Sequence, residues 1–285
     1  MYNFPIGMMS NSFRGYSVKD AILKAKEIGA DGIQFYATEG EATPENMSAE
    51  KRRELLGFMK DNGLVFSALC ADYGHGFMNK DRNDEIIEKS KRIMDLAKDL
   101  ECDIITTHIG VVPTDKMHPR YSIMQEACGR LAEYAVSVGS RFAVETGPER
   151  SIVLKEFLDS LHSKGAGVNL DPANLVMVTR DDPVQAVYNL KDYIVHTHAK
   201  DGINLCLADP EIVYGVMHPV PVEFNGVKFY EELPLGTGGV DFKSYLTALE
   251  DIGYRGFLTI EREVGLDPAA DIEIAYKYLK NIING

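Results

Sequence analysis

The chain has 285 residues, of which 30 are Lys or Arg and 43 are Asp or Glu, so its formal net charge at pH 7 is −13. This acidic balance argues against nucleic acid as the main partner, because binding a phosphate backbone requires patches of Lys and Arg. The 45% hydrophobic and 26% charged fractions are typical of a globular chain with a large core, and no apolar run reaches the roughly 18 residues of a membrane span.

The N-terminal sequence MYNFPIGMMSNSFRG has no signal-peptide pattern. The four cysteines show no CxxC spacing, and three of them lie in apolar stretches: Cys70, Cys102, Cys128 and Cys206. We therefore expect reduced, buried thiols in a cytoplasmic protein. Its expected partner is a small molecule rather than a nucleic acid or a membrane, and the sequence is compatible with a homo-oligomer.

Short apolar segments alternate with amphipathic segments along the whole chain. The apolar segments are nearly continuous in hydrophobicity and predict buried parallel strands at 4–10, 31–36, 64–72, 103–110, 141–147, 166–172, 193–201 and 255–263. The amphipathic segments predict helices at 17–30, 48–63, 83–101, 122–139, 153–165, 182–192, 241–253 and 269–283.

Eight strand–helix units of roughly 36 residues each favour a (β/α)8 TIM barrel, expected as a single domain over 1–285. A doubly wound open sheet is the alternative, but the first turn, MMSNSFRGYS, lacks GxGxxG, and no P-loop pattern is present. The stretch 202–240 is far longer than a usual connection. We expect it to be a long loop on the carboxyl-terminal face, acting as a lid or shaping the substrate pocket with Tyr214, His218, Phe224 and Phe229.

Polar residues at the ends of four consecutive predicted strands would meet at one rim of the barrel. They are Glu145, Asp171, His198 and Glu261. Any one of them could be a solvated strand end, but three crowded carboxylates repel one another unless a cation, a shared proton or a charge network balances them. Carboxylates and an imidazole without a thiolate suit one divalent ion such as Mn²⁺, Mg²⁺, Co²⁺ or Zn²⁺.

Three further residues are candidates for contacts with substrate. His196 lies on the same side of its strand as His198 but one layer deeper, where packing or support of the site is favoured over contact with substrate. His108 ends the fourth predicted strand and faces the mouth, unless it is a satisfied core imidazole. Lys200 could hold a phosphate or stabilise an oxyanion, or could be a solvated lysine at the rim.

The chain resembles the sugar phosphate isomerase/epimerase superfamily with the xylose isomerase-like TIM barrel, which includes ketose 3-epimerases, hydroxypyruvate isomerase-like enzymes and inosose isomerases. The motifs that carry the resemblance are VETG, NLDPANL, VHTHAKD and PLGTGGVDFKSYLTALEDIGYRGFLTIERE. The resemblance implies that Glu145, Asp171, His198 and Glu261 hold the family's single divalent metal. Asn174 stands where the family has a substrate-contacting His, which implies an altered substrate contact. The endonuclease IV branch uses extra His and Glu residues to hold three zinc ions, and this acidic chain lacks the basic surface that DNA would require.

The family mechanism agrees with what these residues could do. A divalent ion acidifies a C–H beside a carbonyl and stabilises a cis-enediolate, while Glu145 and Glu261 remove and return the proton. The sequence therefore predicts a metal-dependent sugar or sugar-phosphate isomerase or epimerase. The alternatives are a metal-dependent lyase or dehydratase acting on a 3-oxo-sugar, 3-oxo-glycoside or inosose, and a non-catalytic barrel.

Overall fold

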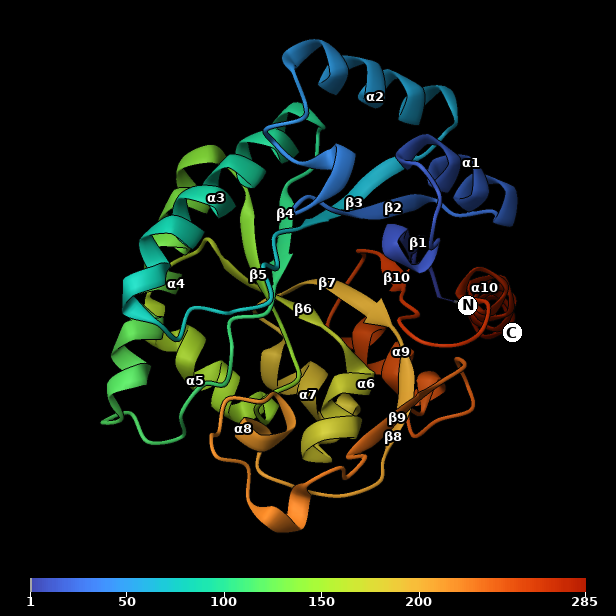
Figure 1. The fold of residues 1–285 in the computed structure, drawn as a ribbon. Coiled ribbons are helices and arrows are strands. Elements are labelled where there is room, and N and C mark those ends of the chain that lie inside the picture. Colours follow the sequence, from blue (N-terminus) through green and yellow to red (C-terminus); the bar gives the residue numbers. More distant parts are fainter. Residues whose placement is uncertain (1) are drawn as a thin grey trace.

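The computed structural model describes residues 2–285 and confirms the predicted TIM barrel. Eight parallel strands close in the order β1-β10-β7-β6-β5-β4-β3-β2 (Figure 1). Each lies inside a predicted segment: β1 (Ile6–Met9), β2 (Gly32–Tyr36), β3 (Val65–Cys70), β4 (Ile104–Thr107), β5 (Arg141–Glu145), β6 (Ala166–Leu170), β7 (Ile194–Ala199) and β10 (Leu258–Ile260). Nearly every residue of these strands is buried, as expected of strands covered on both faces.

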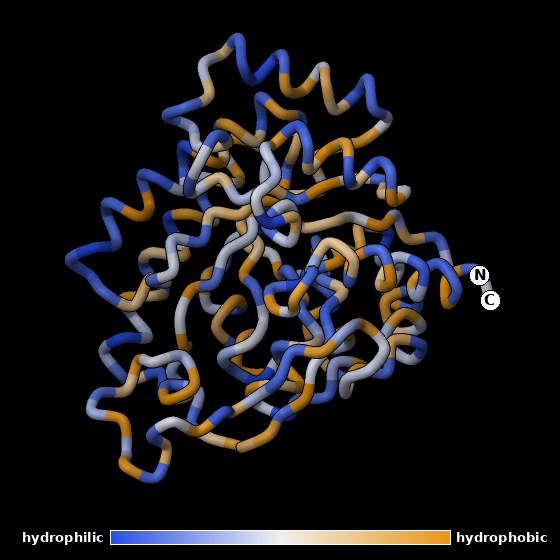
Figure 2. Tube along the Cα trace, turned by 45° about the vertical axis from the view of Figure 1, so that its right-hand side comes forward, coloured by the Kyte–Doolittle hydropathy of each residue, from blue (hydrophilic) through white to orange (hydrophobic). Residues whose placement is uncertain are grey.

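Helices surround the strands and turn their apolar sides inward (Figure 2). The eight that follow the barrel strands are α1 (Val18–Ile28), α2 (Ala49–Asp61), α3 (Lys80–Asp99), α4 (Pro119–Val138), α5 (Ser151–Leu161), α7 (Pro183–Leu190), α9 (Phe242–Asp251) and α10 (Pro268–Asn284). Helix α5 ends four residues before the expected segment 153–165 does, because His162 takes a left-handed backbone conformation with φ of 49°. Within residues 2–285, none of the helices combines the length and apolar character needed to cross a membrane.

The segment 202–240 is more ordered than a long loop. Strand β8 (Asp201–Asn204) follows β7 almost directly and pairs antiparallel with β9 (Tyr230–Leu233), and the short helix α8 (Pro210–Val213) lies between them. The sequence YEEL of β9 is short and polar, so apolar patterning could not reveal it. This small sheet packs on α6 (Pro172–Asn174) and the π-helical turn Leu175–Thr179 that follow β6, at the carboxyl-terminal side of the barrel.

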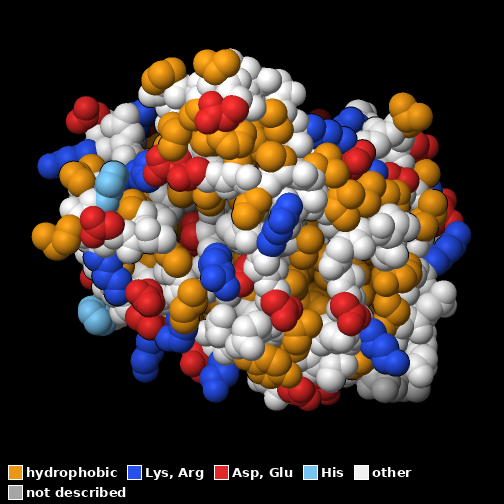
Figure 3. Space-filling model, turned by 90° about the horizontal axis from the view of Figure 1, so that it is seen from below, with side chains coloured by type: hydrophobic (Ala, Val, Ile, Leu, Met, Phe, Trp, Pro, Cys, Tyr) orange, Lys and Arg blue, Asp and Glu red, His pale blue; other side chains and the backbone are white. Residues whose placement is uncertain are grey.

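The four cysteines are free, and Cys70, Cys102 and Cys128 are buried as expected. On the face shown in Figure 3, Lys and Arg side chains are scattered among Asp, Glu and apolar side chains rather than gathered in one area.

Candidate metal centre

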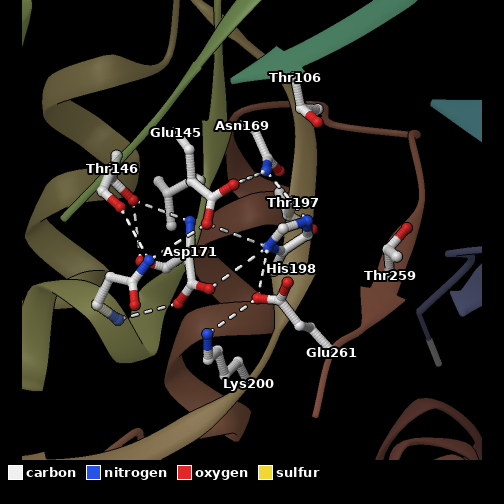
Figure 4. Close-up of polar contacts among 12 residues, drawn as sticks. Thr106, Glu145, Thr146, Asn169, Asp171, Thr197, His198, Lys200, Thr259 and Glu261 are labelled. Atoms are coloured by element: carbon white, nitrogen blue, oxygen red, sulfur yellow. Dashed lines mark hydrogen bonds and ion pairs between the residues drawn. The ribbon is translucent and has the colours of Figure 1, made fainter. Parts of the chain in front are cut away.

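The structure brings the four predicted metal ligands together. Glu145 ends β5, Asp171 directly follows β6, His198 lies on β7 and Glu261 directly follows β10. Because these four strands are neighbours in the barrel, their side chains converge on one point at the carboxyl-terminal end (Figure 4). One ligand atom from each residue lies within 4.8 Å of all the others, and all four residues are buried.

The imidazole of His198 is the centre of this cluster. Its Nδ1 atom lies 3.3 Å from Glu261 Oε2, 3.4 Å from Asp171 Oδ2 and 3.5 Å from Glu145 Oε1. Both His198 Nδ1 and Asp171 Oδ2 are buried without a hydrogen-bond partner. Buried polar atoms are rarely left unpaired, and oxygen and nitrogen atoms in this arrangement match the ligands that divalent ions take in proteins. The four residues therefore fit one divalent cation.

The charges of the cluster act strongly on one another. Burial lowers the pKa of His198, but the carboxylates of Glu261 and Glu145 outweigh burial and hold it well above its usual range. Burial raises the pKa of Glu261, but Lys200 and His198 outweigh it and hold this pKa below its usual range. In the metal-free chain, an imidazolium on His198 therefore balances part of the carboxylate charge.

A polar layer inside the barrel orients His198 from below. Its Nε2 atom donates to Gln34 Oε1 at 3.2 Å, which leaves Nδ1 directed at the carboxylates. His196 is fully buried in the same layer, with its Nε2 atom 2.9 Å from both Gln34 Oε1 and Thr259 Oγ1. This position, with Nε2 bonded inside the barrel, agrees with the packing or supporting role expected for His196, and contact of His196 with substrate stays a prediction.

Two asparagines hold Glu145. The Nδ2 atom of Asn169 donates to Glu145 Oε2 at 3.1 Å, and that of Asn174 donates to Glu145 Oε1 at 3.2 Å. Asn174 also donates to the carbonyl of Thr146, and its backbone N–H caps the carboxylate of Asp171. Asn174 therefore holds two of the predicted metal ligands, Glu145 through its side chain and Asp171 through its backbone, and its contact with substrate stays a prediction.

Lys200 is buried, with 3% of its surface exposed, so it is not a solvated lysine at the rim. Its ammonium group lies 3.0 Å from Glu261 Oε2 and 3.8 Å from Glu232 Oε2, and it also contacts the Glu263 carboxylate. Burial lowers the pKa of Lys200, but these carboxylates hold it well above its usual range. Lys200 is therefore a fixed positive charge beside Glu261. Sequence reading missed Glu232, which lies on the unpredicted strand β9.

His108 contacts the cluster from β4. Its Nδ1 atom lies 2.9 Å from Asp72 Oδ2, and its Nε2 atom lies 3.5 Å from Glu145 Oε1. Burial lowers the pKa of His108, but Glu145 and the hydrogen bond to Asp72 raise it to about 10. The sequence analysis missed Asp72, although it follows β3 and could have been found by the strand-end reasoning that found Asp171.

Tyr214 is the residue of the segment 202–240 that reaches the metal centre. Its ring centroid lies 6.4 Å from that of His108, and a Cβ atom on Gly147 would lie 2.6 Å from Tyr214 Oη. A glycine two residues after Glu145 therefore lets the tyrosine approach the backbone closely. Of the other residues expected to line the pocket, Phe224 packs against Phe229, with ring centroids 5.9 Å apart, and His218 is exposed.

Comparison with known proteins identifies the family. The family model described as xylose isomerase-like TIM barrel matches residues 22–282. The crystal structure of a xylose isomerase domain protein from Planctomyces limnophilus superposes with a TM-score of 0.80 at 26% identity, covering 99% of this chain and 97% of that one.

Two further similarities are to proteins with named activities. The probable 3-DHS dehydratase AsbF of Bacillus anthracis, involved in petrobactin synthesis, superposes with a TM-score of 0.75 at 21% identity, covering 98% of this chain and 99% of that one. A putative L-ribulose-5-phosphate 3-epimerase, SgbU of Escherichia coli K12, is 22% identical over 98% of this chain and 96% of its own length. At these identities the superposition with AsbF shows the shared fold alone.

Proposed function

Because this chain belongs to the xylose isomerase-like TIM barrel family, we propose that it is a divalent-metal-dependent sugar isomerase or epimerase that works by proton transfer. The observation that carries the proposal is the convergence of Glu145, Asp171 and Glu261 on the unpaired Nδ1 atom of His198. A divalent cation bound there would polarise a carbonyl and its adjacent hydroxyl and so acidify the neighbouring C–H.

Glu145 and Glu261 are the proposed acid and base. They end strands on different sides of His198, so a sugar carbon held between them would have one carboxylate on each face. Return of the proton to the opposite face of the same carbon inverts that carbon, and return to the neighbouring carbon interconverts aldose and ketose. Asn169 and Asn174 fix the orientation of Glu145, and Lys200 fixes that of Glu261.

A dehydratase or lyase acting on a 3-oxo-sugar, 3-oxo-glycoside or inosose is the second candidate. The pair of His108 and Asp72 favours it, because an imidazole 3.5 Å from Glu145 could protonate a departing hydroxyl after Glu145 takes the C–H proton. The fold likeness to AsbF is compatible with this chemistry.

The deciding experiment is incubation of the purified protein with a panel of ketoses and 3-oxo-sugars in D₂O, with added Mn²⁺, Mg²⁺, Co²⁺ or Zn²⁺. An isomerase or epimerase incorporates deuterium at carbon and keeps the substrate's mass otherwise unchanged, whereas a dehydratase loses water and forms a new double bond. Incorporation should stop when the metal is chelated. If no C–H in the panel exchanges and the protein binds none of these metals, a non-catalytic barrel is the better interpretation.

A further inference from the structure

The loops after β7 and β10 are where TIM barrels frequently bind phosphate, using cations, glycine-rich turns and the N-terminus of a nearby helix. In this chain the region holds Lys200, Arg262, the glycine-rich turn 234–240 and the N-terminus of α10. Each of them is already bonded to a carboxylate of the chain itself.

The two cations are fully engaged. Lys200 contacts the carboxylates of Glu261, Glu263 and Glu232. Arg262 is also buried, and its guanidinium donates to Glu232 Oε1 and to Asp271 Oδ2, both at 2.7 Å. A phosphate bound at either cation would compete with carboxylates already paired to it, of which Glu261 and Glu232 are buried.

The glycine-rich turn holds an anion that belongs to the chain. The buried carboxylate of Asp201 accepts N–H bonds from Gly236 at 2.9 Å, Gly238 at 2.8 Å and Val240 at 3.1 Å. Such a ring of backbone N–H groups is an anion-binding concavity. A Cβ atom on Gly238 would lie 2.2 Å from Asp201 Oδ1, so the turn needs glycine to enclose this carboxylate.

The helix terminus is capped in the same way. Asp267 accepts the N–H of Ala270 at 3.1 Å at the start of α10, and Asp271 lies in its first turn. Among the described residues, Arg14 is a further cation that reaches this rim, and its guanidinium donates to the backbone carbonyl of Glu263. Next to the metal centre, this rim therefore presents more carboxylates than cations: Asp201, Glu232, Glu261, Glu263 and Asp271 against Lys200, Arg262 and Arg14.

We propose that the substrate is an uncharged, polyhydroxylated carbohydrate, and that the loops after β7 and β10 reject sugar phosphates. This proposal rests on the proposed function. A phosphate monoester carries nearly two negative charges at neutral pH and would face a wall in which carboxylates outnumber cations. Sugar hydroxyls can donate hydrogen bonds to the same carboxylates, so this wall suits an unphosphorylated sugar.

The test compares matched substrates on the Mn²⁺-loaded protein. A panel of free ketopentoses and ketohexoses and the same ketoses with a terminal phosphate are followed by deuterium incorporation at carbon in D₂O. We expect kcat/KM for the best free sugar to exceed that of its phosphate by at least about 100-fold. A phosphorylated ketose that exchanges as fast as its free form, or faster, would overturn this proposal while leaving the proposed function intact.

A second measurement does not depend on turnover. The melting temperature of the metal-free protein is recorded against inorganic phosphate at constant ionic strength. We expect no saturable rise, whereas saturable stabilisation with a Kd below about 1 mM would contradict the proposal, since a ligand of the folded state raises stability as it saturates. Absence of deuterium exchange with every sugar would refute the proposed function. The phosphate titration would then still test whether the loops after β7 and β10 reject phosphate.

A charge variant provides a matched control. Glu263→Gln removes one half-exposed carboxylate beside Lys200, and Glu273→Gln removes an exposed carboxylate of α10 that pairs with Lys277. Removing one charge a few ångströms from a dianion changes its binding by on the order of tenfold. The ratio of kcat/KM for the free sugar to kcat/KM for its phosphate should therefore decrease by about tenfold in Glu263→Gln and stay unchanged in Glu273→Gln. If this ratio were equal in the two variants, the acidic wall would not be what rejects the phosphate.

Discussion

Replacement of Glu145 by Gln separates proton transfer from metal binding. In the wild type, the two carboxylate oxygens of Glu145 accept hydrogen bonds from different side-chain amides, that of Asn174 at 3.2 Å and that of Asn169 at 3.1 Å. A glutamine oxygen can accept from only one of them, so the other amide loses its acceptor at a cost of about 1–3 kcal/mol. For a chain of this size, each kcal/mol lowers the melting temperature by roughly 2 °C, so the variant should remain folded. Its amide oxygen can still bind a cation but cannot take up a proton.

We therefore expect Glu145→Gln to bind Mn²⁺ more weakly and, at saturating Mn²⁺, to lose at least about 100-fold in kcat for deuterium incorporation. Calorimetric titration of Mn²⁺ and NMR exchange in D₂O measure the two effects separately. Glu149→Gln is the matched control, because Glu149 is a buried glutamate on the same β5–α5 turn but outside the cluster. Turnover within threefold of the wild type in Glu145→Gln would refute the two-carboxylate mechanism. Glu261, the other proposed acid or base, would then become the leading candidate for the group that removes the proton.

Three further predictions concern pH and the support of the centre. A cation must displace the proton from His198, because the pKa of this imidazole lies well above its usual range. The logarithm of the association constant for Mn²⁺ should therefore rise by about one per pH unit between pH 6 and 8, and an association constant independent of pH would contradict this. Burial raises the pKa of Glu149 to about 8, so the free energy of unfolding of the wild type should fall as pH rises from about 4.5 to 8. Above pH 8, urea unfolding should show Glu149→Gln to be more stable than the wild type by on the order of 2–5 kcal/mol. Equal stability of the two proteins at pH 9 would argue against a buried, ionising carboxyl. Gln34→Leu removes the acceptor for His198 Nε2 and should weaken Mn²⁺ binding by about 10–100-fold, whereas Gln34→Glu keeps an acceptor and serves as the comparison. Equal Mn²⁺ affinities of the two variants would exclude this positioning role of Gln34.

The barrel and the metal cluster could be predicted from sequence for one reason. In parallel strands the order along the chain determines which ends become neighbours, so the last polar residue of each apolar run can be located without coordinates. Glu145, Asp171, His198 and Glu261 all follow this rule. Asp72, which follows β3, obeys the same rule.

The supporting residues could not be predicted in this way. Gln34 lies on β2, across the barrel from β7, and its bond to His198 depends on the closure of the barrel rather than on any local pattern. Glu232 belongs to a polar strand whose pairing with β8 is not encoded in apolar periodicity. The contacts of Asn174 and Lys200 with Glu145 and Glu261 could not be predicted for a related reason, because strand-end reasoning gives the direction of a side chain but not the carboxylates that it bonds.

The charges of the completed centre give a physical reason for this arrangement. With His198 protonated, the three carboxylates of the cluster and Lys200 leave one net negative charge. The neighbouring pairs His108–Asp72 and Arg262–Glu232 add none, and half-exposed Glu263 does not belong to this set. A divalent cation that replaces the proton of His198 makes the set neutral. If Glu145 takes a proton from a neutral sugar, as proposed, one negative charge would move from the carboxylate to the sugar and the total would stay unchanged. The centre can therefore remain closed to water during proton transfer, because no counterion has to enter or leave, whereas a dianionic substrate would destroy this balance on binding.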